Sequence, residues 1–142
     1  MNLRQFATAG VVMTLCALGL LSSPSQPSST RSPQKDIAVD GDGQTSTIDC
    51  KGGAVNISGD DNTITLMNEC SRLMVTGDDN TVKAETVAQI QVLGDDNTIV
   101  VQAVGRINTT GDDNTVTWTR GIGGKPPEIS NTGDDNKTTQ AR

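Results

Sequence analysis

The tetrapeptide Gly-Asp-Asp-Asn occurs at residues 59–62, 77–80, 94–97, 111–114 and 133–136. A degenerate copy, Gly-Asp-Gly-Gln, occupies residues 41–44. Successive copies begin 18, 18, 17, 17 and 22 residues apart. A period of this length is typical of a stacked repeat protein in which each unit forms one coil.

Apolar and polar residues alternate on both sides of each tetrapeptide. Four positions before the glycine, every unit has an aliphatic residue: Ile37, Val55, Leu73, Ile90, Ile107 and Ile129. Five positions after it, the four central units have Ile64, Val82, Ile99 and Val116. A period of two residues indicates half-buried strands, and no segment after Lys35 has helical spacing. Each unit is therefore predicted to be a strand, a turn and a second strand.

The sequence predicts an all-β fold, namely a short parallel β-helix (solenoid) of about six coils with 17–18 residues per coil, over residues 36–142. A third side of each coil is expected from the seventh residue before the next glycine, which is Gly52, Cys70, Val87 or Val104. The main alternative is an antiparallel meander in which every tetrapeptide closes a hairpin. That fold explains the turns, but it does not require the same residue at the same position of every tetrapeptide.

The composition of the tetrapeptide indicates a sharp bend, because glycine adopts positive φ and Asp and Asn tolerate the left-handed region. Asparagines at the same depth of successive coils can hydrogen-bond to one another. We therefore predict a structural asparagine ladder, formed by Asn62, Asn80, Asn97, Asn114 and Asn136.

The repeat weakens toward the C-terminus. Residues 120–128 add a loop with Pro126 and Pro127, and the last unit places polar residues in rows that are apolar elsewhere. This final unit is expected to be a cap or a frayed end. Trp118 is predicted to plug the open end of the stack, and the alternative is an isolated surface aromatic.

Residues 1–25 are predicted to be a secretory signal peptide, because Arg4 precedes an uncharged apolar run at 7–21. Cys16 lies in this run and would be removed with it. The alternative is an uncleaved membrane anchor, although the run is short for a span. Residues 26–35 are rich in Pro and Ser and are predicted to be a flexible tether. The mature chain is thus expected to be secreted or held at the cell envelope, without a transmembrane span.

Two cysteines remain after removal of the leader, Cys50 and Cys70. They fall near the same corner of neighbouring coils, and adjacent strands lie about 4.8 Å apart. Bridged cysteines have Cα atoms about 4.4 to 6.8 Å apart, so a disulfide is predicted in an oxidising compartment. Two free buried thiols are the alternative.

The charge and composition exclude several function classes. The chain has 17 acidic and 11 basic residues, and the basic residues are scattered, which argues against nucleic acid as a partner. It contains no His and no Tyr, which removes most of the usual general bases and metal ligands. We therefore predict that the protein is not an enzyme and needs no cofactor.

The most concentrated group of ionisable residues in the sequence is the set of aspartates in the turns. Stacked coils would place the turn aspartates in two columns, which repel unless they are screened or neutralised. Calcium prefers such oxygen ligands, so the candidate metal residues are Asp60, Asp61, Asp78, Asp79, Asp95, Asp96, Asp112 and Asp113. The alternative is a solvated acidic edge that confers solubility.

Part of this pattern resembles the calcium-binding nonapeptide repeats, through Gly59, Asp61 and Ile64. Those repeats have two glycine-rich turns per coil, whereas this chain has one acidic turn per coil and lacks the second glycine. The chain has a fuller similarity to an exported bacterial family of unknown function with Gly-x-x-Asn-Thr-Val units. The resembling features are the leader, the Cys50 and Cys70 pair, and the units that begin at Gly59, Gly77, Gly94 and Gly111. The resemblance covers residues 36–140 and implies a secreted or envelope-associated repeat domain, with no assigned reaction or ligand.

These observations favour a non-enzymatic structural or binding module with an unidentified envelope or extracellular partner. One alternative is a calcium-binding repeat domain that folds on export. Another is a small polysaccharide-active enzyme that uses paired carboxylates. Outward threonine pairs such as Thr63 and Thr65 also resemble ice-binding solenoids, but Lys83 and Val100 interrupt that column.

Overall fold

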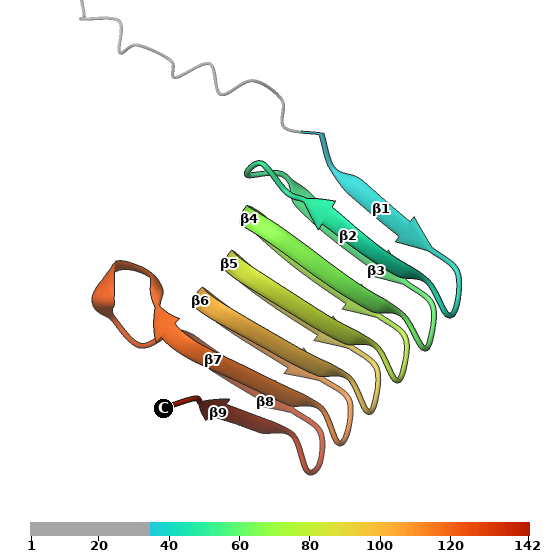
Figure 1. Cartoon of the computed structure of the whole chain (residues 1–142). Coiled ribbons are helices and arrows are strands. Elements are labelled where there is room, and N and C mark those ends of the chain that lie inside the picture. The colour runs from blue at the N-terminus through green and yellow to red at the C-terminus, as the bar shows by residue number, and fades with distance from the viewer. Residues whose placement is uncertain (1–34) are drawn as a thin grey trace, which may run out of the picture. The chain divides into compact units, whose positions relative to one another are not determined.

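The computed structural model describes residues 35–142, which form nine strands and one 3-10 turn (Figure 1). The predicted signal peptide, and the predicted tether except for Lys35, lie outside the described residues. The elements are β1 (Ile37–Asp40), β2 (Thr45–Asp49), β3 (Ala54–Ser58), β4 (Thr63–Thr76), β5 (Thr81–Leu93), β6 (Thr98–Thr110), β7 (Thr115–Gly121), η1 (Ile122–Gly124), β8 (Glu128–Thr132) and β9 (Lys137–Gln140).

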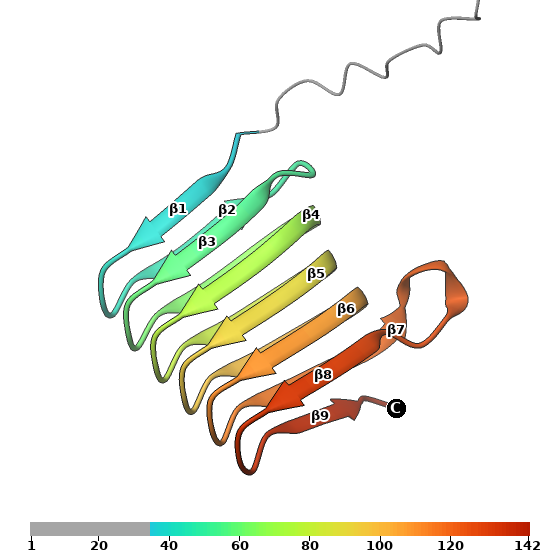
Figure 2. The same ribbon diagram turned by 180° about the vertical axis from the view of Figure 1, so that it is seen from behind.

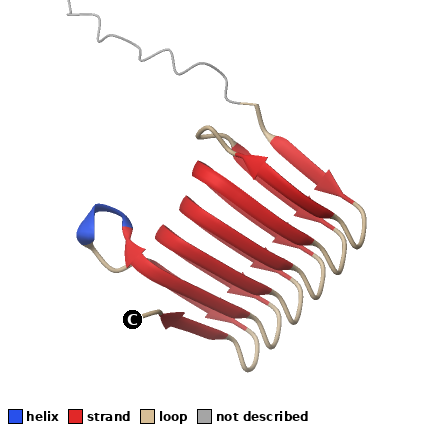
Figure 3. Ribbon diagram, viewed as in Figure 1, coloured by secondary structure: helices blue, strands red, loops and turns tan. Residues whose placement is uncertain are grey.

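Every strand pairs in parallel with the strand one coil away. The start of β4 pairs with β2 and its end pairs with β3, so one long strand contributes to two faces of the coil. In the same way β6 pairs with both β7 and β8. Figures 1 and 2 show these two faces from opposite sides, and Figure 3 shows the turns in a row along one edge. The structure is a parallel β-solenoid of about six turns, as predicted, and the antiparallel meander is wrong.

The interior consists of aliphatic rows that run along the solenoid axis. Ile64 pairs with Val82, Val82 with Ile99, and Ile99 with Val116. None of these four side chains is more than 1% exposed. Burial of each such side chain contributes about 1.5 to 3 kcal/mol, so the rows supply the main favourable term in folding. The predicted alignment of like residues is therefore confirmed.

The corner opposite the turns is formed by the middle of β4, β5 and β6 and not by separate strands. Of the residues predicted for a third side, Cys70, Val87 and Val104 are in register at this corner and fully buried, whereas Gly52 is half-buried in a turn. The register shifts between Leu66 and Glu69, where β4 has one more residue than β5. This extra residue explains why the earlier coils have 18 residues and the next two have 17.

The C-terminal coil departs from this geometry at an inserted segment. Residues 122–127 stand opposite the single residue Gly105, because Val104 pairs with Gly121 and Arg106 pairs with Glu128. We call residues 121–127 the inserted loop. Figure 1 shows it projecting from the side of the solenoid away from the turns. Beyond it, β8 and β9 complete an ordered last coil, so the polar final unit is a cap.

Within residues 35–142 there is no helix whose length and apolar character would let it cross a membrane.

Candidate functional site

Glycine is required in the turns for two reasons, which Gly77 illustrates. Its φ of 121° lies in a region that side-chain-bearing residues rarely adopt. A Cβ at this position would also lie 2.7 Å from Asp60 Oδ1 and would meet the backbone carbonyl of Gly59 in the preceding coil. The turns stack too closely to admit a side chain at this position.

The first aspartate of each turn forms a hydrogen-bonded column. Asp60 Oδ1 accepts the backbone N–H of Asp78 at 2.8 Å, and Asp78 Oδ1 accepts that of Asp95 at 2.8 Å. The same bond recurs from Asp42 to Asp60, from Asp95 to Asp112 and from Asp112 to Asp134. These carboxylates therefore join neighbouring coils.

The second aspartate of each turn lies in the left-handed region. The φ angles are between 50° and 58° for Asp61, Asp79, Asp96, Asp113 and Asp135. These residues are exposed and form the second acidic column. In the middle of the column the pKa of Asp96 is raised, first by loss of surrounding water and then by the negative charges of Asp113 and Asp79. Repulsion along this column therefore opposes the folded state at neutral pH.

The eight candidate metal residues lie in these two columns, with Asp60, Asp78, Asp95 and Asp112 in the first and Asp61, Asp79, Asp96 and Asp113 in the second. Among residues 35–142 there is no group of three or more acidic, His or Cys side chains that could hold a metal ion. In addition, one oxygen of each first-column carboxylate already accepts a backbone N–H. A calcium site stays a prediction, and the structural role of the first column is established by its hydrogen bonds.

The predicted asparagine ladder is confirmed, and its members are buried except for Asn136, which is half-buried. Asn97 Oδ1 accepts the backbone N–H of Asn80 at 3.0 Å, and its Nδ2 donates to the carbonyl of Gly77 at 2.8 Å. Asn80 and Asn114 make the equivalent pairs of bonds. Beside the degenerate first turn, Nδ2 of Asn62 is buried and has no partner among the described residues. The ladder satisfies polar groups that would otherwise be buried unpaired.

Cys50 and Cys70 meet at the corner opposite the turns, with sulfurs at disulfide distance and Cα atoms 5.0 Å apart. Both side chains are buried. This arrangement matches the predicted pairing between neighbouring coils and links the N-terminal coil to the second coil.

A polar cluster covers the same corner. The amide of Asn68 donates to Asp49 Oδ1 at 2.8 Å, and this hydrogen bond lowers the pKa of Asp49. Lys51 Nζ lies 3.5 Å from Asp49 Oδ2 and acts in the same direction, while loss of water acts in the opposite one. Asp49 is therefore a structural carboxylate at the end of the solenoid that the Cys50 and Cys70 pair links.

Trp118 closes the other end of the core, as predicted. It pairs with Val101 and Gln140, belongs to the buried cluster and is only 8% exposed. Its Nε1 is buried without a partner among the described residues.

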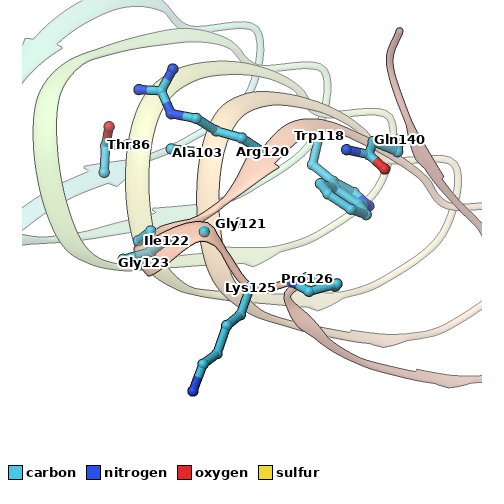
Figure 4. Close-up of a pocket in the computed structure, with 11 residues that line it drawn as sticks. Thr86, Ala103, Trp118, Arg120, Gly121, Ile122, Gly123, Lys125, Pro126 and Gln140 are labelled. Atoms are coloured by element: carbon cyan, nitrogen blue, oxygen red, sulfur yellow. The ribbon is translucent and has the colours of Figure 1, made fainter.

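A cavity of about 510 Å³ lies between Trp118 and the inserted loop (Figure 4). It is lined by Thr86, Ala103, Trp118, Arg120, Gly121, Ile122, Gly123, Gly124, Lys125, Pro126 and Gln140. Sequence reasoning located the insertion but interpreted it only as a change at the end of the stack. The combination of an interrupted repeat, the sole tryptophan and two basic residues could have indicated this site.

The fold and the turn geometry define a β-solenoid repeat protein. The family described as "Protein of unknown function (DUF3060)" matches residues 57–105 and 86–135, which together cover more than half of the 142-residue chain. The chain therefore belongs to this family, in agreement with the resemblance to an uncharacterised repeat family. No curated protein and no solved structure matches the chain.

Proposed function

We propose that this chain is an exported, non-enzymatic β-solenoid that acts as a structural or binding module at the cell envelope or outside the cell. The observation that carries the proposal is the use of the repeated polar residues. The first aspartate and the asparagine of each turn bond to the equivalent turn of a neighbouring coil. The most concentrated polar residues of the sequence therefore serve to hold neighbouring coils together by hydrogen bonds.

The arrangement of the carboxylates argues against an enzyme. Acid–base catalysis by two carboxylates requires different environments, so that one is protonated while the other is ionised. Here the turn aspartates occupy equivalent positions in successive coils. The pKa of Asp96 is raised first by loss of surrounding water and then by the charges of equivalent turn aspartates such as Asp113 and Asp79, and no carboxylate outside the repeat contributes. A polysaccharide-active enzyme would require a carboxylate pair that breaks the repeat.

Export is supported by two features that are independent of each other. The leader has the charge and apolar length of a secretory signal. The pairing of Cys50 and Cys70 suits an oxidising compartment, where disulfides persist. A binding role suits the solenoid because stacked coils present extended flat faces.

The test is a pull-down from envelope extract with the processed chain, with and without calcium. We expect a specific envelope component to be retained, and we expect no release of reducing ends from acidic polysaccharides. Turnover of such a polysaccharide would replace the binding role with an enzymatic one. Mass spectrometry of the N-terminus tests export separately, because a chain that keeps residues 1–25 would contradict signal cleavage.

A further inference from the structure

The cavity beside the inserted loop lies at the place where the repeat is broken. In the regular coils the residues of the inner rows are in register with their counterparts in the next coil. Residues 122–127 have no counterpart, because only Gly105 faces them in β6. The identity of these residues is therefore not constrained by packing against an equivalent residue in the next coil, as it is in the regular coils.

The charge of the cavity is opposite to that of the chain. Arg120 and Lys125 line it and no acidic residue does, whereas the net charge of the whole chain is −6. Among the described residues, neither of these two cations forms an ion pair; the pairs are Lys51 with Asp49 and Arg106 with Glu128. Figure 4 shows Arg120, from the end of β7, and Lys125, from the inserted loop, extending in opposite directions on the two sides of Gly121. The cavity is thus suited to an anionic ligand.

The rest of the lining is suited to a small ring with polar substituents. Trp118 lines the cavity with the small part of its surface that is exposed, 8%, and because its Nε1 is buried this part consists of carbon. Gln140 donates its Nε2 to the carbonyl of Thr119 at 3.0 Å, which leaves Oε1 as an acceptor. Thr86 adds a hydroxyl. A volume of about 510 Å³ falls within the usual range for small-molecule sites.

We propose that this cavity binds an anionic saccharide unit, with carbon atoms of the sugar against the small exposed part of Trp118 and the acidic group in the positive field of Arg120 and Lys125. The inference rests on the proposed binding function and names its ligand class. The acidic group is a carboxylate in a uronic acid or a phosphate in a sugar phosphate, since both accept charged hydrogen bonds. Gln140 and Thr86 then bond to sugar hydroxyls.

The chain contains a single tryptophan, so its fluorescence reports on the cavity directly. The processed chain is titrated at constant ionic strength with oligogalacturonate, with glucose 6-phosphate, and with methyl-esterified oligogalacturonate as the matched neutral probe. We expect at least one anion to change the fluorescence saturably, with calorimetry giving the same affinity. The esterified probe should bind at least about tenfold more weakly, because it lacks the charge that the two cations pair with.

Three variants separate the cavity from general charge effects. Arg120→Gln and Lys125→Gln should each weaken anion binding about tenfold. Lys83→Gln removes the same charge from an exposed position outside the cavity and should leave binding unchanged. Circular dichroism checks that each variant is folded, which is expected because Arg120 and Lys125 are exposed.

The proposal is overturned if neither anion gives a saturable response, if the esterified probe binds equally well, or if Lys83→Gln weakens binding as much as Arg120→Gln. A double variant, Arg120→Gln with Lys125→Gln, is also tested in the envelope pull-down. Full retention of the envelope component by this variant refutes the cavity and leaves the proposed function intact. Failure of the unmodified chain to retain any component counts against the proposed function itself.

Discussion

The turn edge and the inserted loop of this solenoid use their residues in different ways. Along the turn edge, Gly, Asp and Asn recur because each contacts the equivalent turn of an adjacent coil. Residues 122–127 have no such counterpart, and beside them lie a cavity and two cations, Arg120 and Lys125, that form no ion pair among the described residues. In a repeat protein, regular recurrence thus indicates stacking, and an interruption indicates where a ligand is to be sought.

The largest effect on stability is expected when a glycine of the turn edge is replaced by alanine, and the same replacement in the inserted loop serves as the control. Gly94→Ala combines a φ of 134° with a Cβ that meets the backbone carbonyl of Gly77. Both strain and overlap oppose it, so we expect the free energy of unfolding to fall by more than about 3 kcal/mol. Chemical denaturation followed by circular dichroism measures this.

Gly123→Ala is the matched control in the inserted loop. Gly123 also has positive φ, 71°, but a Cβ there has no neighbour within 4 Å. The cost should be only that of the backbone conformation, about 1 kcal/mol. Equal costs at the two positions would contradict the requirement for close stacking at the turn edge.

The next effect is expected from Asn97→Ala. This change leaves the backbone N–H of Asn80 and the carbonyl of Gly77 without their side-chain partner in a buried site. Unpaired buried groups cost about 1 to 3 kcal/mol, so a loss of about 2 to 3 kcal/mol is expected in the same denaturation experiment. Asn108→Ala, on the outer surface of β6, should change stability by less than about 0.5 kcal/mol. Similar losses for both variants would show that the ladder contributes little.

A smaller, pH-dependent effect is expected from Asp96→Asn. Because the pKa of Asp96 is raised in the folded state, ionisation of this carboxyl opposes folding. That penalty is absent below the unfolded pKa of about 3.8 and is fully present above the folded pKa. The variant should therefore melt at a higher temperature than the parent at pH 7, and the charge-dependent part of this difference should vanish near pH 3.

Two comparisons isolate the charge effect. A difference that does not depend on pH would report only the backbone preference of Asn in the left-handed region. Asp36→Asn removes the same charge outside the turns and should show no such rise. A melting temperature that falls at pH 7 for Asp96→Asn would contradict repulsion along the second column.

The smallest effect is expected from calcium. The two acidic columns contain no group of three or more ligands among the described residues. Calcium should therefore raise the melting temperature no more than magnesium at the same ionic strength, since both only screen the columns. A rise specific to calcium that saturates at a fixed stoichiometry would instead support the predicted metal site.

The sequence predicted the parts of the structure that depend on repetition. The alternation around Ile99 predicted a buried row, because a period of two residues leaves one face of a strand inside. The identity of Asn97 with its equivalents predicted a ladder, since like residues stack in register. The spacing of Cys50 and Cys70 predicted their meeting at one corner, because one coil separates them.

The parts that depend on a single three-dimensional arrangement were not predicted. The two columns of aspartates were predicted, but both were given the same role, whereas the structure shows that the first-column carboxylates accept backbone N–H groups of the next coil. Sequence alone does not show which carboxylate points along the stack. The cavity was missed because Trp118, Arg120 and Lys125 come together only through the path of the inserted loop.

The most direct test of the account is a nuclear Overhauser measurement on the methyl groups of the interior, made on the unmodified processed chain. In-register winding places Ile99 between Val82 and Val116. The account predicts strong methyl contacts from Ile99 to both of these residues. Absence of these contacts, together with close backbone contacts between Leu93 and Thr98 across the turn, would indicate a hairpin and contradict the solenoid.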